Sequence, residues 1–576
     1  MKPTPNINYA WSELMIRELN RLGAGAFFLA PGSRSSPLAL SAVEWGEKTL
    51  VHMDERALGF VALGYARATG RPAVVVTTSG SAAANLWPAV CEASLDAVPL
   101  ILLTADRPPE LRDTGANQTM DQVKLFGDYV RWFADVPCPD MALRPEYVLS
   151  TVDHAYFKAM HGHPGPVHLN QMFREPLAPS PGDDRTEAWR RSLKTWWKSD
   201  EPWTSTYPSS CDASLAAVAP LLAQARRGVI VAGALRNSEE REAVLAAAKR
   251  LRWPVLPDIR SGLRLGRSAR GVITMADHIL LSERVRARMR PDVVLHLGGR
   301  VTSKRIQQWV RDSGAAVIMV NNLPVRMDPD HQIAQRLVTD LHPGLAWPSA
   351  TRTPAGWSRK WQELNARVTT AWRAMWRESE TITEPAVAAG ISEWLPDHHR
   401  LVLASSMPIR DMEMYGGRTQ AAVPVSANRG VSGIDGNLAT AVGVAIGSGQ
   451  PVTIILGDLA LLHDLNSLAL LKKSPVPVIA VVVNNNGGGI FSFLPVADIP
   501  RHFETCFGTP HDLSGFSDAA SLFDLDYAGP KTMTELKKVY RAALTSGAST
   551  LIEVQTDRTE NLKEHQRIQM ALQNLK

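Results

Sequence analysis

Short runs of consecutive apolar residues recur in three groups along the 576-residue chain, and they limit its fold more than any other feature. Because a half-exposed strand alternates apolar and polar side chains, unbroken Val, Ile and Leu runs predict strands buried on both faces. Helical patterns between the runs predict an α/β protein with three doubly wound domains and mainly parallel sheets. The runs lie at 26–32, 73–78, 99–105 and 166–170, then 227–234, 292–299 and 315–322, then 400–406, 451–458, 477–485 and 549–556.

Two stretches between these groups have the composition of linkers. Residues 178–212 are rich in Pro, Ser, Asp and Trp, and residues 347–356 read WPSATRTPAG. A chain of this length is also expected to form several domains. We therefore predict domains at 1–185, 186–355 and 356–576.

Charge and composition exclude several classes of protein. The net charge of +5 is spread along the chain without a lysine-rich block, so nucleic acid is not an expected partner. No apolar segment is long enough to span a membrane, and the polar N-terminus lacks the apolar core of a signal sequence. The 4 cysteines form no CxxC pair, which fits a reducing cytoplasm. We expect a cytoplasmic protein with small-molecule substrates.

The strongest local motif follows two strands of the third group. Gly457 and Asp458 end one apolar run, Asn485 ends the next, and Gly487 follows it. Ligands bind at this edge of open parallel sheets, and a carboxylate, an amide oxygen and a main-chain carbonyl suit Mg²⁺ or Mn²⁺. The alternative is two capping residues and a loop. The pair resembles the GD…NN motif of thiamine-diphosphate enzymes, although Leu459 stands where a third motif residue is often Gly.

Such an enzyme needs a carboxyl group beside the aminopyrimidine ring of its cofactor. There it bonds a ring nitrogen and favours the imino tautomer that deprotonates the thiazolium ring. Glu55 is the candidate, because it opens a helix directly after a short strand at 49–53. The alternative is a helix-start carboxylate that is favoured by the helix dipole.

Longer motifs extend the resemblance over nearly the whole chain. They are APGSRSSPL at 30–38, DERALG at 54–59, TADRPPELRDTGANQ at 104–118, SKRIQQW at 303–309, SANRGVSGIDG at 426–436 and VVVNNNGGGIF at 481–491. The chain resembles the 2-succinyl-5-enolpyruvyl-6-hydroxy-3-cyclohexene-1-carboxylate synthases of menaquinone biosynthesis, which are thiamine-diphosphate-dependent transferases. The resemblance implies that 2-oxoglutarate is decarboxylated and that the carbanion equivalent adds to isochorismate.

Both implied substrates are dicarboxylates, so an arginine-rich pocket is expected. Taken alone, each arginine is better explained as a surface cation, but arginines lie within motifs from all three groups. The residues expected to bind substrate are Ser33, Arg34, Arg107, Asn117, Gln118, Lys304, Arg305, Ser406, Arg410, Arg429, Ile490 and Phe491. Those expected to bind the cofactor are Glu55, Ser406, Ile434, Gly457, Asp458, Leu459, Asn485 and Gly487, of which Asp458, Asn485 and Gly487 would also bind the metal.

The resemblance also implies a homodimer or a dimer of dimers with shared active sites. Two other functions remain open. One is a different thiamine-diphosphate 2-oxo acid decarboxylase or acetolactate-type synthase, which the arginine-bearing motifs disfavour. The other is a non-catalytic binding protein of the same fold, which intact Glu55, Asp458 and Asn485 disfavour.

Overall fold

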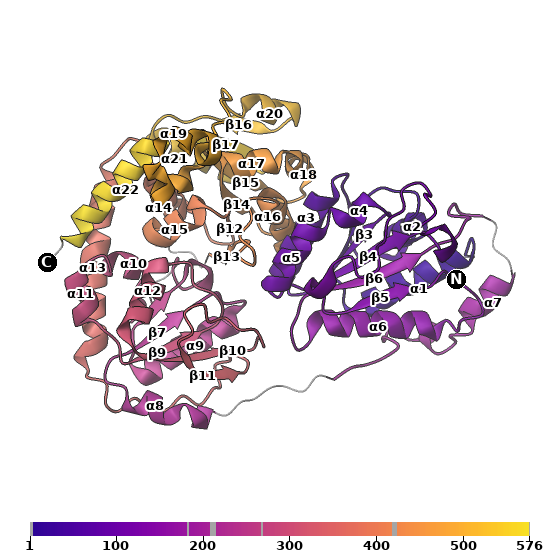
Figure 1. Cartoon of the computed structure of the whole chain (residues 1–576), viewed down its shortest axis with the longest axis horizontal. Coiled ribbons are helices and arrows are strands. Elements are labelled where there is room, and N and C mark those ends of the chain that lie inside the picture. The colour runs from indigo at the N-terminus through magenta and orange to yellow at the C-terminus, as the bar shows by residue number, and fades with distance from the viewer. Residues whose placement is uncertain (1–3, 181–183, 208–214, 267–268, 418–422, 575–576) are drawn as a thin grey trace. The chain divides into compact units, whose positions relative to one another are not determined.

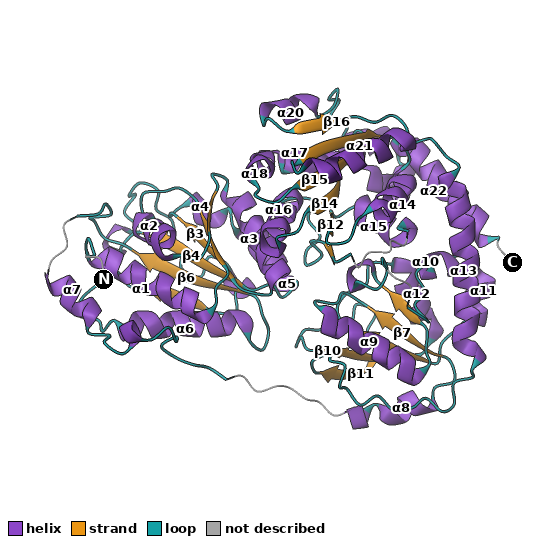
Figure 2. Cartoon of the chain, turned by 180° about the vertical axis from the view of Figure 1, so that it is seen from behind, coloured by secondary structure: helices purple, strands orange, loops and turns teal. Residues whose placement is uncertain are grey.

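The three groups of apolar runs form three separate β-sheets in the computed structural model (Figure 1). The structure describes residues 4–180, 184–207, 215–266, 269–417 and 423–574. Every strand pairing among these residues is parallel, and Figure 2 shows each sheet flanked by helices. The predicted α/β class with mainly parallel sheets is therefore confirmed.

The first sheet has six strands in the order β2-β1-β3-β4-β6-β5. Its strands are β1 (Ala26–Leu29), β2 (Thr49–Val51), β3 (Ala73–Thr77), β4 (Leu100–Asp106), β5 (Phe133–Val136) and β6 (Pro166–Met172). Its main helices are α1 (Ile7–Leu22), α2 (Ser36–Trp45), α3 (Glu55–Thr69), α4 (Ser81–Ala84), α5 (Trp87–Leu95), α6 (Glu146–Met160) and α7 (Asp184–Arg191). All residues of β1, β3, β4 and β6 are buried, as unbroken apolar runs require.

The middle sheet has five strands in the order β11-β10-β9-β7-β8. Its strands are β7 (Gly228–Ala232), β8 (Val255–Pro257), β9 (Val293–Leu297), β10 (Ala316–Asn321) and β11 (Ile333–Val338). Its helices are α8 (Ala219–Gln224), α9 (Ser238–Leu251), α10 (Ala276–Ile279), α11 (Glu283–Arg288) and α12 (Lys304–Ser313).

The third sheet repeats the topology of the first, with the order β13-β12-β14-β15-β17-β16. Its strands are β12 (Arg400–Leu403), β13 (Val425–Ser426), β14 (Val452–Gly457), β15 (Val478–Asn484), β16 (Asp526–Ala528) and β17 (Thr550–Gln555). The helices of this region are α13 (Gly356–Arg377), α14 (Glu384–Trp394), α15 (Met407–Tyr415), α16 (Asn437–Ser448), α17 (Asp458–His463), α18 (Leu468–Lys473), α19 (Pro500–Phe503), α20 (Ser517–Leu522), α21 (Met533–Ser546) and α22 (Arg558–Gln573).

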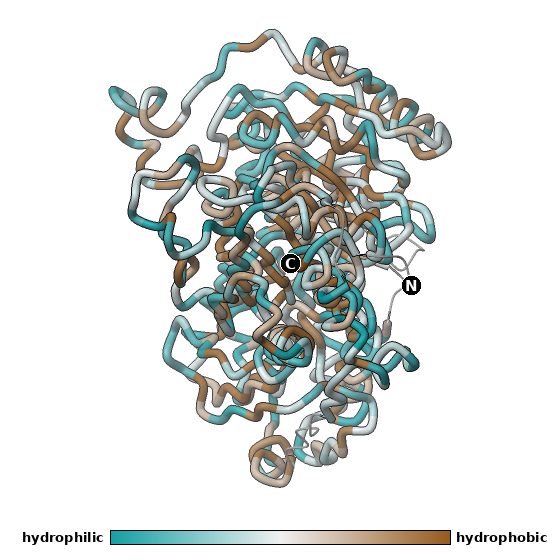
Figure 3. The backbone as a smooth tube through the Cα atoms, turned by 90° about the vertical axis from the view of Figure 1, so that its right-hand side faces the viewer, coloured by the Kyte–Doolittle hydropathy of each residue, from teal (hydrophilic) through white to brown (hydrophobic). Residues whose placement is uncertain are grey.

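The helices are amphipathic and bury one side against the strands. In α13, one side is formed by buried tryptophans that lie in a single hydrophobic core, namely Trp357, Trp361, Trp372 and Trp376. Figure 3 shows hydrophobic stretches toward the inside of the fold and hydrophilic ones along many outer loops. Among the described residues, no helix combines the length and the apolar character that crossing a membrane requires.

The chain divides into two compact units that do not follow the order of the sheets. One comprises residues 1–209, 428–449 and 463–476, and the other comprises 210–427, 450–462 and 477–576. In the first unit, helix α16 packs along α3 at very close range. A Cβ atom added at Gly443 would lie 2.0 Å from the carbonyl oxygen of Val61, so only glycine fits there. The two boundaries between the three predicted domains stay a prediction.

Candidate active site

Two arginines of the first unit lie close together at the carboxyl ends of strands. Arg34 follows β1 and Arg107 follows β4, and their residues are 7% and 8% exposed. Burial, and then the neighbouring charge of Arg34, lower the pKa of Arg107. Among the described residues, the ion pair of Arg34 is with Glu175, at 4.0 Å. Two poorly neutralised buried cations create a place where an anion would be stabilised.

Neutral groups surround this arginine pair. Arg107 donates a hydrogen bond to Oγ of Ser79, and Ser79 donates to the carbonyl oxygen of Gln118 at 3.0 Å. Nε2 of Gln118 in turn donates to the carbonyl oxygen of Ser79 at 3.1 Å. The structure thus joins Arg107 and Gln118 through Ser79. Ser33 and Asn117 are exposed on nearby loops of the chain.

Glu55 is the first residue of α3, directly after the helix cap. The capping bonds come from Asp54, whose side chain accepts from the main-chain N–H groups of Arg56 and Ala57 at 3.0 and 3.2 Å. Glu55 is half-buried, and Asn85 donates to its Oε2 atom at 3.4 Å. As the first residue of α3, Glu55 also occupies a position that the helix dipole favours for a carboxylate, so both interpretations of this residue stay open.

Asp458 and Gly487 meet at the carboxyl ends of β14 and β15. The Asp458 residue is 2% exposed, and its Oδ2 atom accepts the N–H of Gly487 at 2.8 Å. Its Oδ1 atom accepts the N–H of Leu459 at 2.7 Å. Burial raises the pKa of Asp458, although these two N–H groups and His511 oppose the rise. His511 Nε2 lies 3.2 Å from Oδ2, a contact that the motifs did not predict.

The amide nitrogen of Asn485 forms a hydrogen bond, whereas its amide oxygen forms none among the described residues. The residue is 9% exposed, and its Nδ2 atom donates to Oε1 of Glu384 at 2.9 Å. Its Oδ1 atom is buried and has no hydrogen-bond partner among the described residues. An unsatisfied buried acceptor is costly, so a ligand that satisfies Oδ1 would stabilise the site. Glu384 was also absent from the predicted site.

The residues at this edge fit a divalent cation and a diphosphate. Asp458 supplies a carboxylate and Asn485 an amide oxygen, which are hard ligands that Mg²⁺ prefers. Gly487 has a φ of 132°, and a Cβ atom there would lie 2.0 Å from the carbonyl oxygen of Gly508. The loop therefore requires glycine at this position. Gly457, the last residue of β14, leads into Asp458.

The 428–436 loop belongs to the first unit and carries Arg429 and Ile434. Glu92 of α5 holds this loop, because its carboxylate accepts the N–H groups of Gly430 and Val431, both at 2.8 Å. Arg429 is half-buried. Ile434 is 37% exposed, so it does not lie in the hydrophobic core. An exposed isoleucine remains available to contact a bound molecule.

Ser406 and Arg410 adjoin each other after strand β12. Ser406 precedes α15 with a φ of 71°, which is uncommon for a residue with a side chain. Arg410 donates a hydrogen bond to the carbonyl oxygen of Ser406. Burial lowers the pKa of Arg410, and the charge of Asp411 opposes that effect. Backbone strain of this kind clusters at functional sites.

Other predicted residues are less clearly prepared for a ligand. Arg305 of α12 forms an ion pair with Asp277, so an anionic ligand would have to compete with that carboxylate. Lys304, the first residue of α12, is exposed. Ile490 and Phe491 are half-buried in a short 3₁₀ helix at Gly489–Phe493, and the Phe491 ring lies 5.5 Å from that of Phe507.

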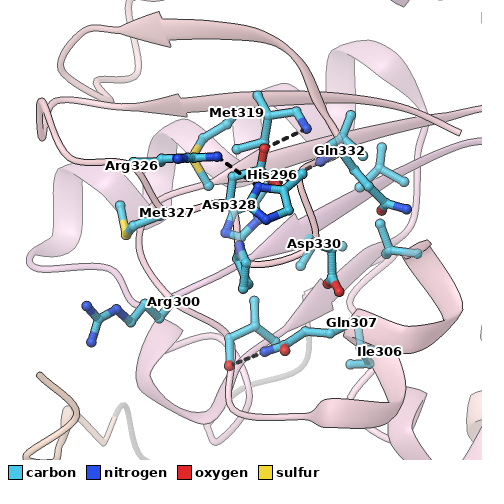
Figure 4. Close-up of a pocket in the computed structure, with 18 residues that line it drawn as sticks. His296, Arg300, Ile306, Gln307, Met319, Arg326, Met327, Asp328, Asp330 and Gln332 are labelled. Carbon is cyan, nitrogen blue, oxygen red and sulfur yellow. Dashed lines mark hydrogen bonds between the residues drawn. The ribbon is translucent and has the colours of Figure 1, made fainter. Parts of the chain in front are cut away.

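The middle sheet borders a separate cavity of about 510 Å³ (Figure 4). Its lining includes Arg300 and Gln307 near α12, His296 of β9 and Arg326 of a following loop. Burial lowers the pKa of His296. None of the predicted substrate or cofactor residues lines this cavity, so it is distinct from the strand-end groups described above.

Comparisons with known proteins define the class of this enzyme. Residues 10–125 match the N-terminal thiamine-pyrophosphate-binding domain of thiamine pyrophosphate enzymes. Residues 187–403 match a middle domain of these enzymes, and residues 417–554 match their C-terminal thiamine-pyrophosphate-binding domain. With three parallel sheets and these matches in order, the chain is a thiamine-diphosphate-dependent enzyme.

Curated relatives identify the family. The chain is 47% identical to a protein of Rubrobacter xylanophilus over 98% of both chains. It is 44% identical to one of Salinibacter ruber over 99% of this chain and 97% of that one, and 41% identical to one of Chlorobium phaeobacteroides over 99% and 98%. Each is named 2-succinyl-5-enolpyruvyl-6-hydroxy-3-cyclohexene-1-carboxylate synthase. The chain belongs to this family of transferases, which confirms the resemblance that its motifs indicated.

Proposed function

We propose that this chain catalyses the reaction in its relatives' name. It decarboxylates 2-oxoglutarate and adds the succinyl carbanion equivalent to isochorismate by 1,4-addition, giving 2-succinyl-5-enolpyruvyl-6-hydroxy-3-cyclohexene-1-carboxylate and CO₂ for menaquinone biosynthesis. The observation that carries this proposal is the buried pair of Arg34 and Arg107. Two adjacent cations suit substrates that each bear two carboxylates.

The substrate carboxylates would bind first to this arginine pair. Arg107 donates a hydrogen bond to Ser79, which Gln118 holds in turn, so the guanidinium of Arg107 is oriented before a ligand arrives. In the same proposal, further carboxylate or hydroxyl contacts come from Ser33, Asn117, Lys304, Arg305, Ser406, Arg410 and Arg429, and an apolar wall comes from Ile490 and Phe491.

Thiamine diphosphate, when bound, supplies an electron sink for decarboxylation and a carbanion equivalent for the addition. Asp458, Asn485 and Gly487 would hold Mg²⁺ or Mn²⁺, and through it the diphosphate, next to Gly457 and Leu459. Glu55 would hold a proton at a nitrogen of the aminopyrimidine ring. Ser406 and Ile434 would contact the remainder of the cofactor.

The work of the chain's own residues is therefore binding, orientation and proton control. The arginines fix the carboxylates of both substrates and stabilise negative charge that develops on the acceptor. Glu55 controls one proton at the cofactor ring. The proposed reaction does not require a nucleophilic side chain of the protein.

The decisive test is a product assay with 2-oxoglutarate and isochorismate together, and with each one alone. We expect the condensed product and stoichiometric CO₂ when both substrates are present, and much slower CO₂ release from 2-oxoglutarate alone. Pyruvate is tested in the same assay. Decarboxylation of pyruvate at the same rate as 2-oxoglutarate would instead support an acetolactate-type enzyme. Absence of any turnover with bound thiamine diphosphate would support a non-catalytic protein.

We also propose that the chain works in the cytoplasm as a homodimer or a dimer of dimers with shared active sites. In the resembled superfamily, the carboxyl group and the metal-binding motif of one site come from different subunits. The two motifs here belong to different sheets, Glu55 to the first and Asp458 to the third. Two-fold symmetry would then give two equivalent sites per dimer.

Mixed dimers of a Glu55→Ala chain and an Asp458→Ala chain test this assembly. One site of each mixed dimer would carry both changes and the other neither. After random reassembly, roughly one quarter of wild-type activity should return, because about half the dimers are mixed and half of their sites are intact. Verified mixed dimers without recovered activity would show that each site is built within one chain.

A further inference from the structure

The amide of Asn485 has two ends of similar shape but opposite chemistry. The oxygen can bind a metal ion, whereas the nitrogen carries two N–H donors and cannot. Rotation of the amide by half a turn would exchange these ends without a change in volume. A site that uses Asn485 as a metal ligand therefore needs a neighbour that distinguishes its two ends.

Glu384 is placed to make this distinction. Its Oε1 atom accepts the Nδ2–H of Asn485 at 2.9 Å and the hydroxyl of Thr556 at 3.3 Å. A carboxyl oxygen can accept these bonds, but it would repel the amide oxygen if the amide were reversed. In the observed orientation, Oδ1 of Asn485 is the buried acceptor left for another partner.

Glu384 is itself held firmly. It is the first residue of α14, and Thr383 before it caps the helix by accepting the N–H of Ala386 at 3.3 Å. The Glu384 residue is 4% exposed, so water does not compete strongly for its carboxyl oxygens. Burial and the charge of Asp411 raise the pKa of Glu384 to about 7. Because Oε1 accepts from both Asn485 and Thr556, a proton on Glu384 belongs on the other carboxyl oxygen, and Oε1 stays an acceptor in either protonation state.

We propose that Glu384 is a positioning residue that orients the amide of Asn485, so that Oδ1 faces the metal ion of the diphosphate site. This inference rests on the proposed function, in which Asn485 binds the metal. Groups that orient a metal ligand from behind commonly change metal affinity by about 10- to 100-fold when they are removed.

The first test measures Mn²⁺ binding by electron paramagnetic resonance, with thiamine diphosphate present. Glu384→Met removes the acceptor at similar volume and should weaken Mn²⁺ binding by about 10- to 100-fold. Glu384→Gln keeps one acceptor oxygen and should bind within about threefold of wild type. Glu413→Met is the matched control, because it removes another buried carboxyl group of the same unit, one that accepts the N–H of Ile259. It should leave Mn²⁺ affinity unchanged.

A second test does not depend on the stability of the methionine variant. Asn485→Asp places a carboxylate against Glu384 and should weaken Mn²⁺ binding. Adding Glu384→Gln supplies an N–H to that carboxylate and should recover about tenfold of the lost affinity. If Glu384 had only a structural role, the effects of the two substitutions on the free energy of Mn²⁺ binding would be additive.

The outcomes separate this inference from the function on which it rests. If wild-type protein binds no Mn²⁺ with thiamine diphosphate, the proposed metal site and the role of Glu384 are both overturned. If wild type binds Mn²⁺ but Glu384→Met binds it equally well, or the double variant shows no recovery, the role of Glu384 alone is overturned.

Discussion

The first and third sheets have one strand order and carry opposite chemistry at the same strand ends. Counted within each sheet, both orders are 2-1-3-4-6-5. The third and fourth strands of the first sheet lead to Ser79 and Arg107. The equivalent strands of the third sheet lead to Asp458 and Asn485. One edge therefore gathers donors and positive charge, and the other gathers oxygen acceptors.

This difference shows which property the fold controls. The parallel topology brings the carboxyl ends of neighbouring strands together, whatever residues follow them. The residues in the loops then determine whether the edge attracts an anion or a cation. At the second strand of each sheet the charges are exchanged. The acidic Glu55 follows β2 of the first sheet, and the basic Arg429 follows β13 of the third. Substitutions at matched strand ends can test how far the two edges are specialised.

The largest effect is expected at the acceptor edge. Asp458→Ala should lower activity by about a thousandfold or more at fixed cofactor concentration, because a metal ligand contributes several kcal/mol. Calorimetry should show that thiamine diphosphate and Mg²⁺ no longer bind together. Ser79→Ala, at the matched position of the first sheet, is the control and should keep cofactor affinity. Unchanged cofactor binding in Asp458→Ala would contradict the assignment of this edge.

The next effect concerns Glu55. Glu55→Gln should bind thiamine diphosphate as wild type does but slow hydrogen exchange at C2 of its thiazolium ring by about a hundredfold or more. Quenched-flow exchange followed by NMR measures this rate directly. Asn85→Ala removes the neighbour that donates to Glu55 and should have a smaller effect. Equal exchange rates in wild type and Glu55→Gln would remove Glu55 from this role.

At the donor edge, Arg107→Met should raise the KM of at least one dicarboxylate substrate by about a hundredfold, since one charged hydrogen-bonded contact is lost. Its melting temperature should not fall much, because the change also relieves repulsion from Arg34. Steady-state kinetics and calorimetry together separate these effects. A large fall in melting temperature with unchanged KM values would make Arg107 a structural residue.

The smallest effect is expected away from both edges, at Asp153 of α6. Burial, and then the neighbouring Glu18, raise the pKa of Asp153 from 3.8 to about 8. The folded chain therefore holds a proton that the unfolded chain releases near pH 4, so stability should fall as pH rises from about 4 to 8. Asp153 is buried, and a difference of one in pKa corresponds to about 1.4 kcal/mol, so we expect the loss to be at least this large. Urea unfolding of Asp153→Asn should show a flatter pH dependence than wild type.

The sequence predicted the central strands well and the edge strands poorly. Every apolar run became a strand, because a central strand needs apolar side chains on both faces. The strands β5, β8, β11, β13 and β16 lay outside the predicted runs, and each lies at the edge of its sheet. Edge strands are short or partly exposed, so they leave little periodic signal.

The site was predictable only where function leaves a local pattern. Asp458 and Asn485 follow strands directly, and the resemblance carried Glu55 and the arginines. His511 and Glu384 contact Asp458 and Asn485 from distant parts of the chain, and Glu92 likewise holds the 428–436 loop. Their roles depend on contacts in the folded chain rather than on residues adjacent in the sequence. The ion pair of Arg305 with Asp277 could not be predicted from the sequence for the same reason.

The close packing of α16 against α3 has a consequence for synthesis on the ribosome. The first unit includes residues 428–449 and 463–476, so its N-terminal part emerges long before its last helices exist. At about 5–20 residues per second, a nascent chain would wait on the order of ten seconds to a minute for them. During that interval the small-residue surface of α3 would have no α16 to cover it. Nascent chains would then be most exposed to chaperones and proteases before residue 449 has left the exit tunnel.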